Sequence, residues 1–102
     1  MPTSNEPIYI AMEEGLEDFV PEYLANRRKE LPLLETLLKA GEFDRIRRMA
    51  HDIKGTGNGF GFPRLTELAS AMEVSAKELN AEAIEGCLAS LRSYLERVRL
   101  KE

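Results

Sequence analysis

The chain has 102 residues, which suffices for one domain with a single modest core. Its formal net charge of −4 argues against binding along the phosphate backbone of a nucleic acid. Its one cysteine, Cys87, has no partner for an internal disulfide, and no apolar stretch is long enough for a membrane span or a signal peptide. We therefore expect a soluble cytoplasmic protein and, because nothing in the sequence indicates oligomerisation, a monomer.

The N-terminal segment shows little periodicity. Residues 1–6 are polar and contain a proline, so we expect them to be flexible. Residues 8–12 form a short apolar run that fits either a strand or a first helical turn, because so few residues cannot show a period. We expect a single domain over residues 1–102, with the helical bundle between about residues 18 and 100.

The first helix is predicted by apolar residues that recur at spacings of three, four and seven, namely Val20, Leu24, Leu31, Leu34 and Leu38. Asp18 precedes this pattern as a candidate N-cap, Pro21 suits the first turn, and Gly41 follows its end. Pro32 lies inside the predicted helix. Because proline lacks a backbone N–H and its ring clashes with the preceding turn, we expect a kink or a break there.

Three further helices are predicted by the same periodicity. The second begins near Glu42, and its apolar stripe comprises Phe43, Ile46, Ala50, Ile53 and Gly57. The third begins at Pro63 and buries Leu65, Leu68, Met72, Ala76 and Leu79. The fourth is capped by Asn80 and buries Ile84, Leu88, Leu91, Leu95 and Val98. Because short connections favour antiparallel neighbours, the predicted fold is an all-α, antiparallel up-down four-helix bundle with a short N-terminal extension.

His51 is the only histidine, and it lies on the second predicted helix away from the apolar stripe. At about 100° per residue, its side chain points roughly 135° from the centre of that stripe, which argues against a core position. Its helical neighbours are Arg47 one turn before it, and Lys54 and Gly55 one turn after it. An exposed imidazole that is flanked by cations and open space suits the transfer of a phosphoryl group. The alternative is a solvated helix face that happens to carry one histidine.

The remaining motifs are weaker. The glycine-rich residues 55–61 resemble a phosphate-binding loop only superficially, because they follow a helix and lack the Gly-Lys-Ser/Thr ending. Cys87 adjoins the apolar stripe of the fourth helix and is expected to be a core thiol. Phe60 and Phe62 are expected to close the end of the bundle, or alternatively to border a docking surface. One histidine, one cysteine and scattered carboxylates give no metal-ligand spacing.

The run His51-Asp52-Ile53-Lys54-Gly55-Thr56-Gly57, followed by Phe60-Gly61-Phe62, Leu65, Leu68-Ala69 and Met72-Glu73, resembles the histidine-containing phosphotransfer (Hpt) domain family. The resemblance implies a helical bundle whose exposed histidine takes a phosphoryl group from the aspartate of a response-regulator receiver domain or a hybrid histidine kinase. The histidine then passes the group to another receiver. The resemblance also implies a carrier rather than an enzyme, without a cofactor of its own, since the magnesium ion belongs to the receiver. Neither a nucleic acid nor a membrane is expected as a partner.

The resemblance assigns roles to individual residues. His51 matches the phosphoacceptor, Lys54 the lysine that neutralises the phosphoryl oxygens, and Gly55 the small residue that makes room for them. Glu73 falls where some members carry a glutamine that hydrogen-bonds the ring, and a carboxylate there would accept from Nδ1–H and leave Nε2 to attack. We expect replacement of the exposed Lys54 to weaken phosphoryl acceptance with little effect on folding. Two secondary candidates for phosphoryl contacts are the cations Arg47 and Lys77.

Two other functions remain open at this point. One is a helical adaptor that binds receiver domains without being phosphorylated, against which the intact His51, Lys54 and Gly55 argue. The other is the substrate domain of a histidine kinase, phosphorylated from ATP by a separate catalytic domain. The two are distinguished by whether, and from which donor, His51 takes up a phosphoryl group.

Overall fold

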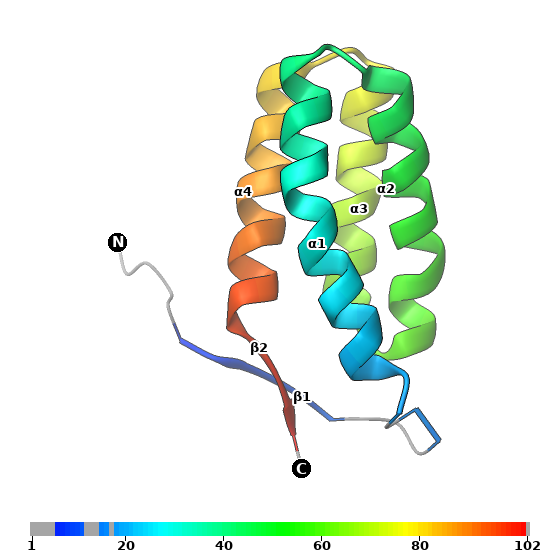
Figure 1. The fold of residues 1–102 in the computed structure, drawn as a ribbon, viewed down its shortest axis with the longest axis vertical. Helices are drawn as coiled ribbons and strands as arrows, with labels where there is room; N and C mark the ends of the chain where they lie inside the picture. Colours follow the sequence, from blue (N-terminus) through cyan, green and yellow to red (C-terminus); the bar gives the residue numbers. More distant parts are fainter. Residues whose placement is uncertain (1–5, 12–14, 17, 102) are drawn as a thin grey trace.

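The computed structural model of the chain describes residues 6–11, 15, 16 and 18–101. The described part contains the helices α1 (Val20–Lys39), α2 (Phe43–Gly57), α3 (Pro63–Lys77) and α4 (Ala81–Arg97), with one 3-10 turn, η1 (Asn58–Phe60), between α2 and α3. Figure 1 shows that the chain reverses direction at each connection, so that successive helices run antiparallel. The predicted all-α bundle of four helices is confirmed, and two short strands, β1 (Ile8–Ala11) and β2 (Val98–Lys101), are added to it.

The first turn of α1 is capped by backbone groups rather than by a side chain. The prediction that Asp18 caps this helix is wrong, because the N-cap residue is Phe19 and its side chain makes no capping hydrogen bond. The carbonyl of Leu16 accepts hydrogen bonds from the N–H groups of Phe19 and Val20 instead. Pro21 occupies the first turn as expected, where its missing N–H costs nothing.

Pro32 does not interrupt α1. Of the predicted kink or break, the break is wrong, because the helix continues on both sides of the proline. Leu31 and Leu34, which flank it, are both buried, and this packing holds the helix together across one missing hydrogen bond. The hydroxyl of Thr36 donates to the carbonyl of Pro32 at 3.0 Å. The helix ends as predicted before Gly41, which adopts a φ of +71° that a glycine accommodates without strain.

The four helices share one core, and most of the predicted apolar positions lie in it. Leu38 and Phe43 are only half-buried against the core, and Leu37 takes the fully packed position next to Leu38. The prediction that Leu79 is buried is wrong: α3 ends at Lys77, and the Leu79 side chain is 66% exposed. The largest fully buried side chains are those of Phe62, Leu34, Ile46, Leu65, Met72, Ile84, Leu91, Leu95, Val20 and Val98.

The turn between α2 and α3 is closed by aromatic side chains. Gly61 has a φ of +91°, and Phe62 after it is completely buried. Phe60 is half-buried and stacks on Tyr23 of α1, with 4.2 Å between the ring centroids. The hydroxyls of Tyr23 and Thr56 are hydrogen-bonded at 2.8 Å, which ties α1 to the last turn of α2. Phe60 and Phe62 therefore close this end of the bundle, and the buried Phe62 is not available to a partner.

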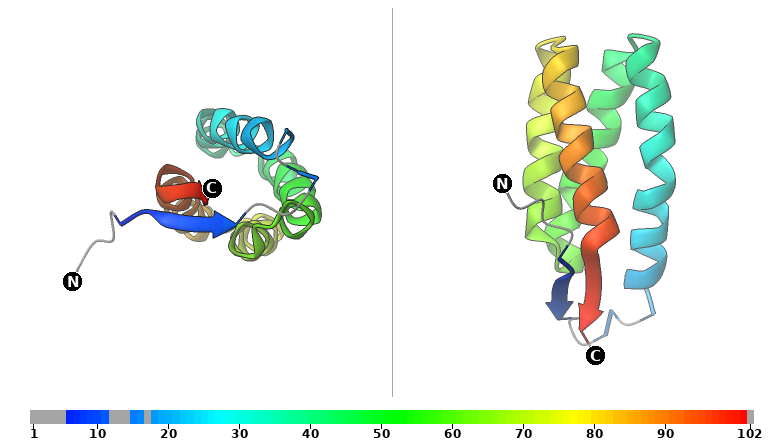
Figure 2. Two further views of the ribbon diagram at one scale, coloured as in Figure 1. Left: turned by 90° about the horizontal axis from the view of Figure 1, so that it is seen from below. Right: turned by 90° about the vertical axis from the view of Figure 1, so that its left-hand side faces the viewer.

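The apolar run near the N-terminus is a strand. β1 and β2 pair in parallel, with Ile8 opposite Val98 and Ile10 opposite Leu100. The prediction that Val98 belongs to the fourth helix is wrong, although the side chain is buried as expected. Figure 2 shows the two strands lying beyond the bundle end at which α4 finishes and α1 begins. Met12, the last residue of the predicted run, lies outside the described residues.

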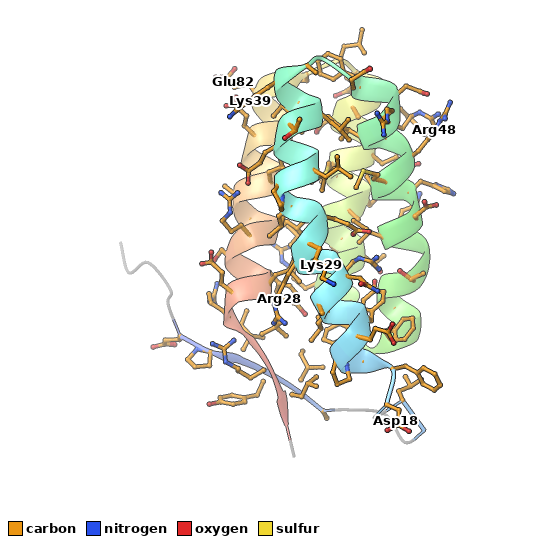
Figure 3. All side chains as sticks on the ribbon, in the orientation of Figure 1. Asp18, Arg28, Lys29, Lys39, Arg48 and Glu82 are labelled. Atoms are coloured by element: carbon orange, nitrogen blue, oxygen red, sulfur yellow. The ribbon has the colours of Figure 1, made fainter. Side chains whose placement is uncertain are left out.

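Two arginine side chains connect α4 to other parts of the chain: one bonds the N-terminal segment, and the other belongs to α1. Of residues 1–6, predicted to be flexible, only Glu6 is described, and its carbonyl accepts from Arg97 Nε at 2.9 Å. Nε and Nη2 of Arg28, labelled in Figure 3, donate to the carbonyl of Leu95 near the end of α4. Cationic donors at this position also complement the negative end of the helix dipole.

Candidate functional site

His51 lies on the solvent-facing side of α2. Its side chain is 62% exposed, whereas Ile46, Ala50 and Ile53 on the same helix are buried in the core. This placement follows from the amphipathic pattern of the helix, in which the histidine stands off the apolar stripe. The ring is therefore accessible to a partner protein.

Glu73 holds one nitrogen of the His51 ring. It comes from α3, which runs beside α2 after the short turn at η1, and its Oε2 lies 2.9 Å from His51 Nδ1. Because an ionised carboxylate only accepts hydrogen bonds, we assign the proton to Nδ1, which leaves a lone pair on Nε2. Among the described residues, none makes a hydrogen bond to Nε2. The nitrogen that keeps its lone pair is thus the one directed away from the carboxylate.

Lys54 binds the second oxygen of the same carboxylate. Its Nζ lies 2.6 Å from Glu73 Oε1, and its side chain is 35% exposed, whereas that of Glu73 is 6% exposed. The hydrogen bond from Lys54 holds the pKa of Glu73 below its ordinary value; burial opposes this shift, and the bond with His51 and the charges of Lys54 and Lys77 support it. Glu73 consequently stays ionised and bridges the histidine and the lysine.

Arg47 is held away from this cluster. It stands one turn before His51, but its Nη2 bonds Asp44 Oδ1 at 2.8 Å, and the other oxygen of Asp44 lies 2.7 Å from Arg48 Nη2. The hydrogen bond from Arg47 is the main cause of the lowered pKa of Asp44. Asp44 was not predicted to be part of the surroundings of His51, although its spacing of three and four residues from two arginines is a recognisable ion-pair pattern.

Lys77 and Gly55 border the site without a hydrogen bond to the ring. Lys77 is exposed one turn after Glu73, and its charge acts on that carboxylate from a distance. Gly55 is exposed one turn after His51, and a Cβ added to it would meet no atom within 4 Å. The surface next to His51 is therefore open on the side of Gly55. The structure thus brings His51, Lys54 and Glu73 together, with Lys77 and Gly55 at the edge and Arg47 engaged elsewhere.

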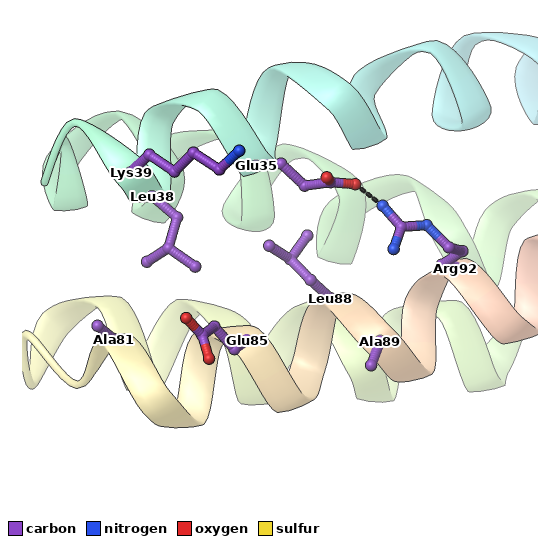
Figure 4. A pocket seen from close by; sticks show the side chains of 8 residues that line it. All are labelled: Glu35, Leu38, Lys39, Ala81, Glu85, Leu88, Ala89 and Arg92. Atoms are coloured by element: carbon purple, nitrogen blue, oxygen red, sulfur yellow. Dashed lines mark ion pairs between the residues drawn. The ribbon is translucent and has the colours of Figure 1, made fainter.

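A separate hollow of about 300 Å³ lies between α1 and α4. Figure 4 shows Leu38 and Leu88 facing each other across it, and Glu35 reaching over to form an ion pair with Arg92. It contains none of the predicted site residues. Over the described residues, no three histidine, cysteine, aspartate or glutamate side chains gather closely enough to hold a metal ion. Cys87 is half-buried against the core.

The comparisons with known proteins identify the family of this bundle. The family model described as Hpt domain matches residues 17–101, so the chain belongs to the Hpt domain family. Hpt domains are helical phosphocarriers of two-component phosphorelays, in which they work with receiver domains and histidine kinases. Comparison with curated proteins and with solved structures produced no match. Within the part of the chain that the structure describes, no helix combines the length and the apolar character that a membrane span requires.

Proposed function

We propose that this Hpt domain accepts a phosphoryl group on His51 Nε2 from the aspartyl phosphate of one receiver domain and passes it to the aspartate of another. The proposal is supported above all by the bond between His51 Nδ1 and Glu73, because it favours one tautomer of a side chain that is otherwise exposed. An exposed imidazole in this tautomer is a ready nucleophile at neutral pH.

The proposed reaction is an in-line displacement. The lone pair of Nε2 forms a bond to phosphorus, the bond between phosphorus and the receiver's aspartate oxygen breaks, and the electron pair leaves with that carboxylate. The Nδ1 proton remains in place, so the phosphorylated ring carries a positive charge. The ionised carboxylate of Glu73, 2.9 Å away, stabilises this charge as it develops. Transfer to the second receiver is the reverse process with a different acceptor.

Lys54 is the proposed contact for the phosphoryl oxygens. In the unphosphorylated protein its ammonium group is bonded to Glu73, next to the ring, so a short movement of a flexible side chain brings it to the incoming group. Lys77 adds positive charge nearby, whereas Arg47 contributes only if it leaves Asp44. Gly55 leaves room for the partner's surface. We propose that the chain uses no cofactor and that the magnesium ion is supplied by the receiver. That the protein acts as a cytoplasmic monomer stays a prediction.

The test is phosphoryl transfer followed by intact-mass measurement. The protein is incubated with phosphorylated receiver domains of the same cell, and its mass is measured at neutral and at acidic pH. Because the chain has one histidine, a gain of one phosphoryl group that is lost in acid and absent from His51→Gln supports the proposal. Asp52→Asn, which changes the exposed neighbour of His51, is the matched control and should accept normally.

Three outcomes would contradict the proposed function. A folded protein that gains no phosphoryl group from any receiver is better described as an adaptor. A protein that is labelled only by ATP and the catalytic domain of a histidine kinase is better described as a kinase substrate domain. Labelling of His51→Gln by a receiver would show that the acceptor residue is wrong.

A further inference from the structure

A small groove lies between the first turn of α2 and the last turn of α3. Its lining comprises Phe43, Asp44, Arg47, Ala76, Lys77 and Leu79, and its volume is about 250 Å³. Pockets for small molecules usually measure about 300–1,000 Å³, so this groove is better matched to a side chain of another protein than to a cofactor. Its apolar part is formed by Phe43, Ala76 and Leu79.

Leu79 has a backbone conformation that an ordinary side chain avoids. Its φ is +56°, and it is the only residue other than glycine with a positive φ in the described part of the chain. It follows the end of α3, where its N–H bonds the carbonyl of Ala76 and the N–H of Asn80 bonds the carbonyl of Ser75. This pair of bonds is the Schellman motif, whose left-handed residue is usually glycine.

The end of α1 provides a direct comparison within the same molecule. There the N–H of Gly41 bonds the carbonyl of Leu38, and the N–H of Glu42 bonds the carbonyl of Leu37, which is the same motif with glycine in the left-handed position. At the end of α3 a leucine occupies that position although its side chain is 66% exposed, so burial in the core does not compensate for the strain. Strained backbone that packing does not explain is typical of functional surfaces.

The groove adjoins the His51 site on the same side of the bundle. Arg47 stands one turn before His51 on α2, and Lys77 stands one turn after Glu73 on α3, so each lies about 6 Å along its helix from the reacting group. Figures 1 and 2 show α2 and α3 side by side along this length. A protein that brings its phosphoryl group to Nε2 therefore also covers the groove.

The rim of the groove is positively charged, in contrast to the chain as a whole. The charged residues that line the groove are Arg47, Lys77 and Asp44, which give a local charge of +1 within a chain of net charge −4. Arg48, which pairs with Asp44, stands outside the lining. Figure 3 shows Arg48 projecting from α2 into solvent. Such a rim attracts an acidic surface and repels a basic one.

We propose that the groove receives an apolar side chain of the receiver domain, flanked by acidic groups, and that Leu79 determines which receivers dock. The inference rests on the proposed function of His51 and concerns the recognition of the partner rather than the chemical step. The strain at Leu79 is retained because the exposed side chain completes the wall of the groove. Burial of one leucine side chain in an interface corresponds to roughly a tenfold to hundredfold change in affinity.

The test uses Leu79→Gly, which keeps the left-handed turn in the form that α1 already has. Single-turnover transfer from a phosphorylated receiver is measured over a range of receiver concentrations, and labelling by the small donor phosphoramidate is measured in parallel. We expect the apparent Kd for the receiver to rise at least about tenfold, with the saturating rate and the labelling by phosphoramidate unchanged. Leu33→Ala, at another exposed leucine that lies on α1 outside the groove, should leave all three quantities unchanged.

An unchanged apparent Kd in Leu79→Gly would overturn the docking role while leaving the role of His51 intact. Slower labelling by phosphoramidate would also overturn it, because Leu79 would then act on the site itself rather than on docking. If the wild-type protein accepts no phosphoryl group from any receiver, the proposed function fails and this inference fails with it.

Discussion

Gly57, at the end of α2, is the glycine at which an added methyl group should destabilise the fold most. A Cβ there would lie 2.4 Å from Thr66 Oγ1, 3.0 Å from Thr66 N and 3.1 Å from the carbonyl oxygen of Phe62. The Thr66 hydroxyl cannot turn away freely, because it donates to the carbonyl of Lys54 at 3.2 Å. The other two atoms belong to the backbone at the start of α3. Gly57→Ala must therefore push the beginning of α3 away from α2.

The magnitude follows from a comparison with Gly55, two residues earlier in the same helix. A Cβ at Gly55 meets no atom within 4 Å, so Gly55→Ala should raise the free energy of unfolding by about 0.5–1 kcal/mol through helix propensity alone. Gly57→Ala has the same propensity gain, but the steric overlap costs about 1–3 kcal/mol. The two variants should therefore differ by about 1–3 kcal/mol, with Gly57→Ala the less stable.

Urea unfolding followed by circular dichroism measures this difference. The unfolding transitions of the wild-type protein, Gly55→Ala and Gly57→Ala should have the same slope, so that the shift in midpoint reports stability alone. The melting temperature of Gly57→Ala should fall below that of Gly55→Ala by roughly 4–8 °C for each kcal/mol. If the two variants unfold within about 0.5 kcal/mol of each other, the close contact between α2 and α3 at Gly57 is not tight enough to matter. Gly55→Ala should also show weakened phosphoryl transfer if a partner uses the space beside His51.

Further substitutions test three other features, namely the ionised carboxylate of Glu73, the cap at Asn80 and the left-handed turn at Leu79. Because the pKa of Glu73 is lowered, its ionised carboxylate contributes stability that is present above about pH 4.5 and is lost as the pH falls through the lowered pKa. Between about pH 6 and about pH 3, a range that brackets the pKa values of carboxyl groups, the wild-type protein should therefore lose more stability in urea titrations than Glu73→Gln. Equal losses would contradict the lowered pKa of Glu73. Asn80 Oδ1 accepts from the N–H of Ala83, so Asn80→Ala should lower the unfolding free energy by about 1 kcal/mol, whereas Asn80→Asp retains the cap. Leu79→Gly should raise the unfolding free energy by about 0.5–1 kcal/mol by relieving the left-handed strain, and Gly41→Leu should lower it. A destabilised Leu79→Gly in thermal unfolding would mean that the leucine side chain packs more than its exposure indicates.

The helices could be predicted because their signal is local. Apolar residues three and four apart mark the buried side of each helix, and short connections determine how neighbouring helices run. Pro32 was wrongly expected to allow a break because propensity is counted residue by residue, whereas the packing of Leu31 and Leu34 acts on the helix as a whole. Leu79 was wrongly placed in the core because its spacing continues the α3 pattern beyond the residue at which the helix ends.

The strands could not be predicted from the sequence because their pairing is non-local. Ile8 and Val98 stand opposite each other at the two ends of the chain, and each strand has only four residues. Such short segments do not establish an alternating period, and a parallel pair leaves no hairpin turn to recognise. The burial of Val98 was predicted, but its place in a strand becomes apparent only because α4 ends at Arg97.

The role of Lys54 shows the same division between local and non-local information, and this division affects how a Lys54 variant is interpreted. From the sequence, Lys54 is an exposed cation whose removal should leave folding intact; in the structure it neutralises the buried carboxylate of Glu73 at 2.6 Å. Lys54→Ala therefore removes the proposed phosphoryl contact and also leaves Glu73 with His51 as its remaining hydrogen-bond partner, so a loss of transfer in this variant could have two causes. The Glu73→Gln background separates them, because the amide carries no charge for Lys54 to neutralise. If Lys54→Ala still reduces transfer in the Glu73→Gln background, the loss is caused by the missing contact with the phosphoryl group. If it no longer does so, the loss is caused by the missing support of Glu73.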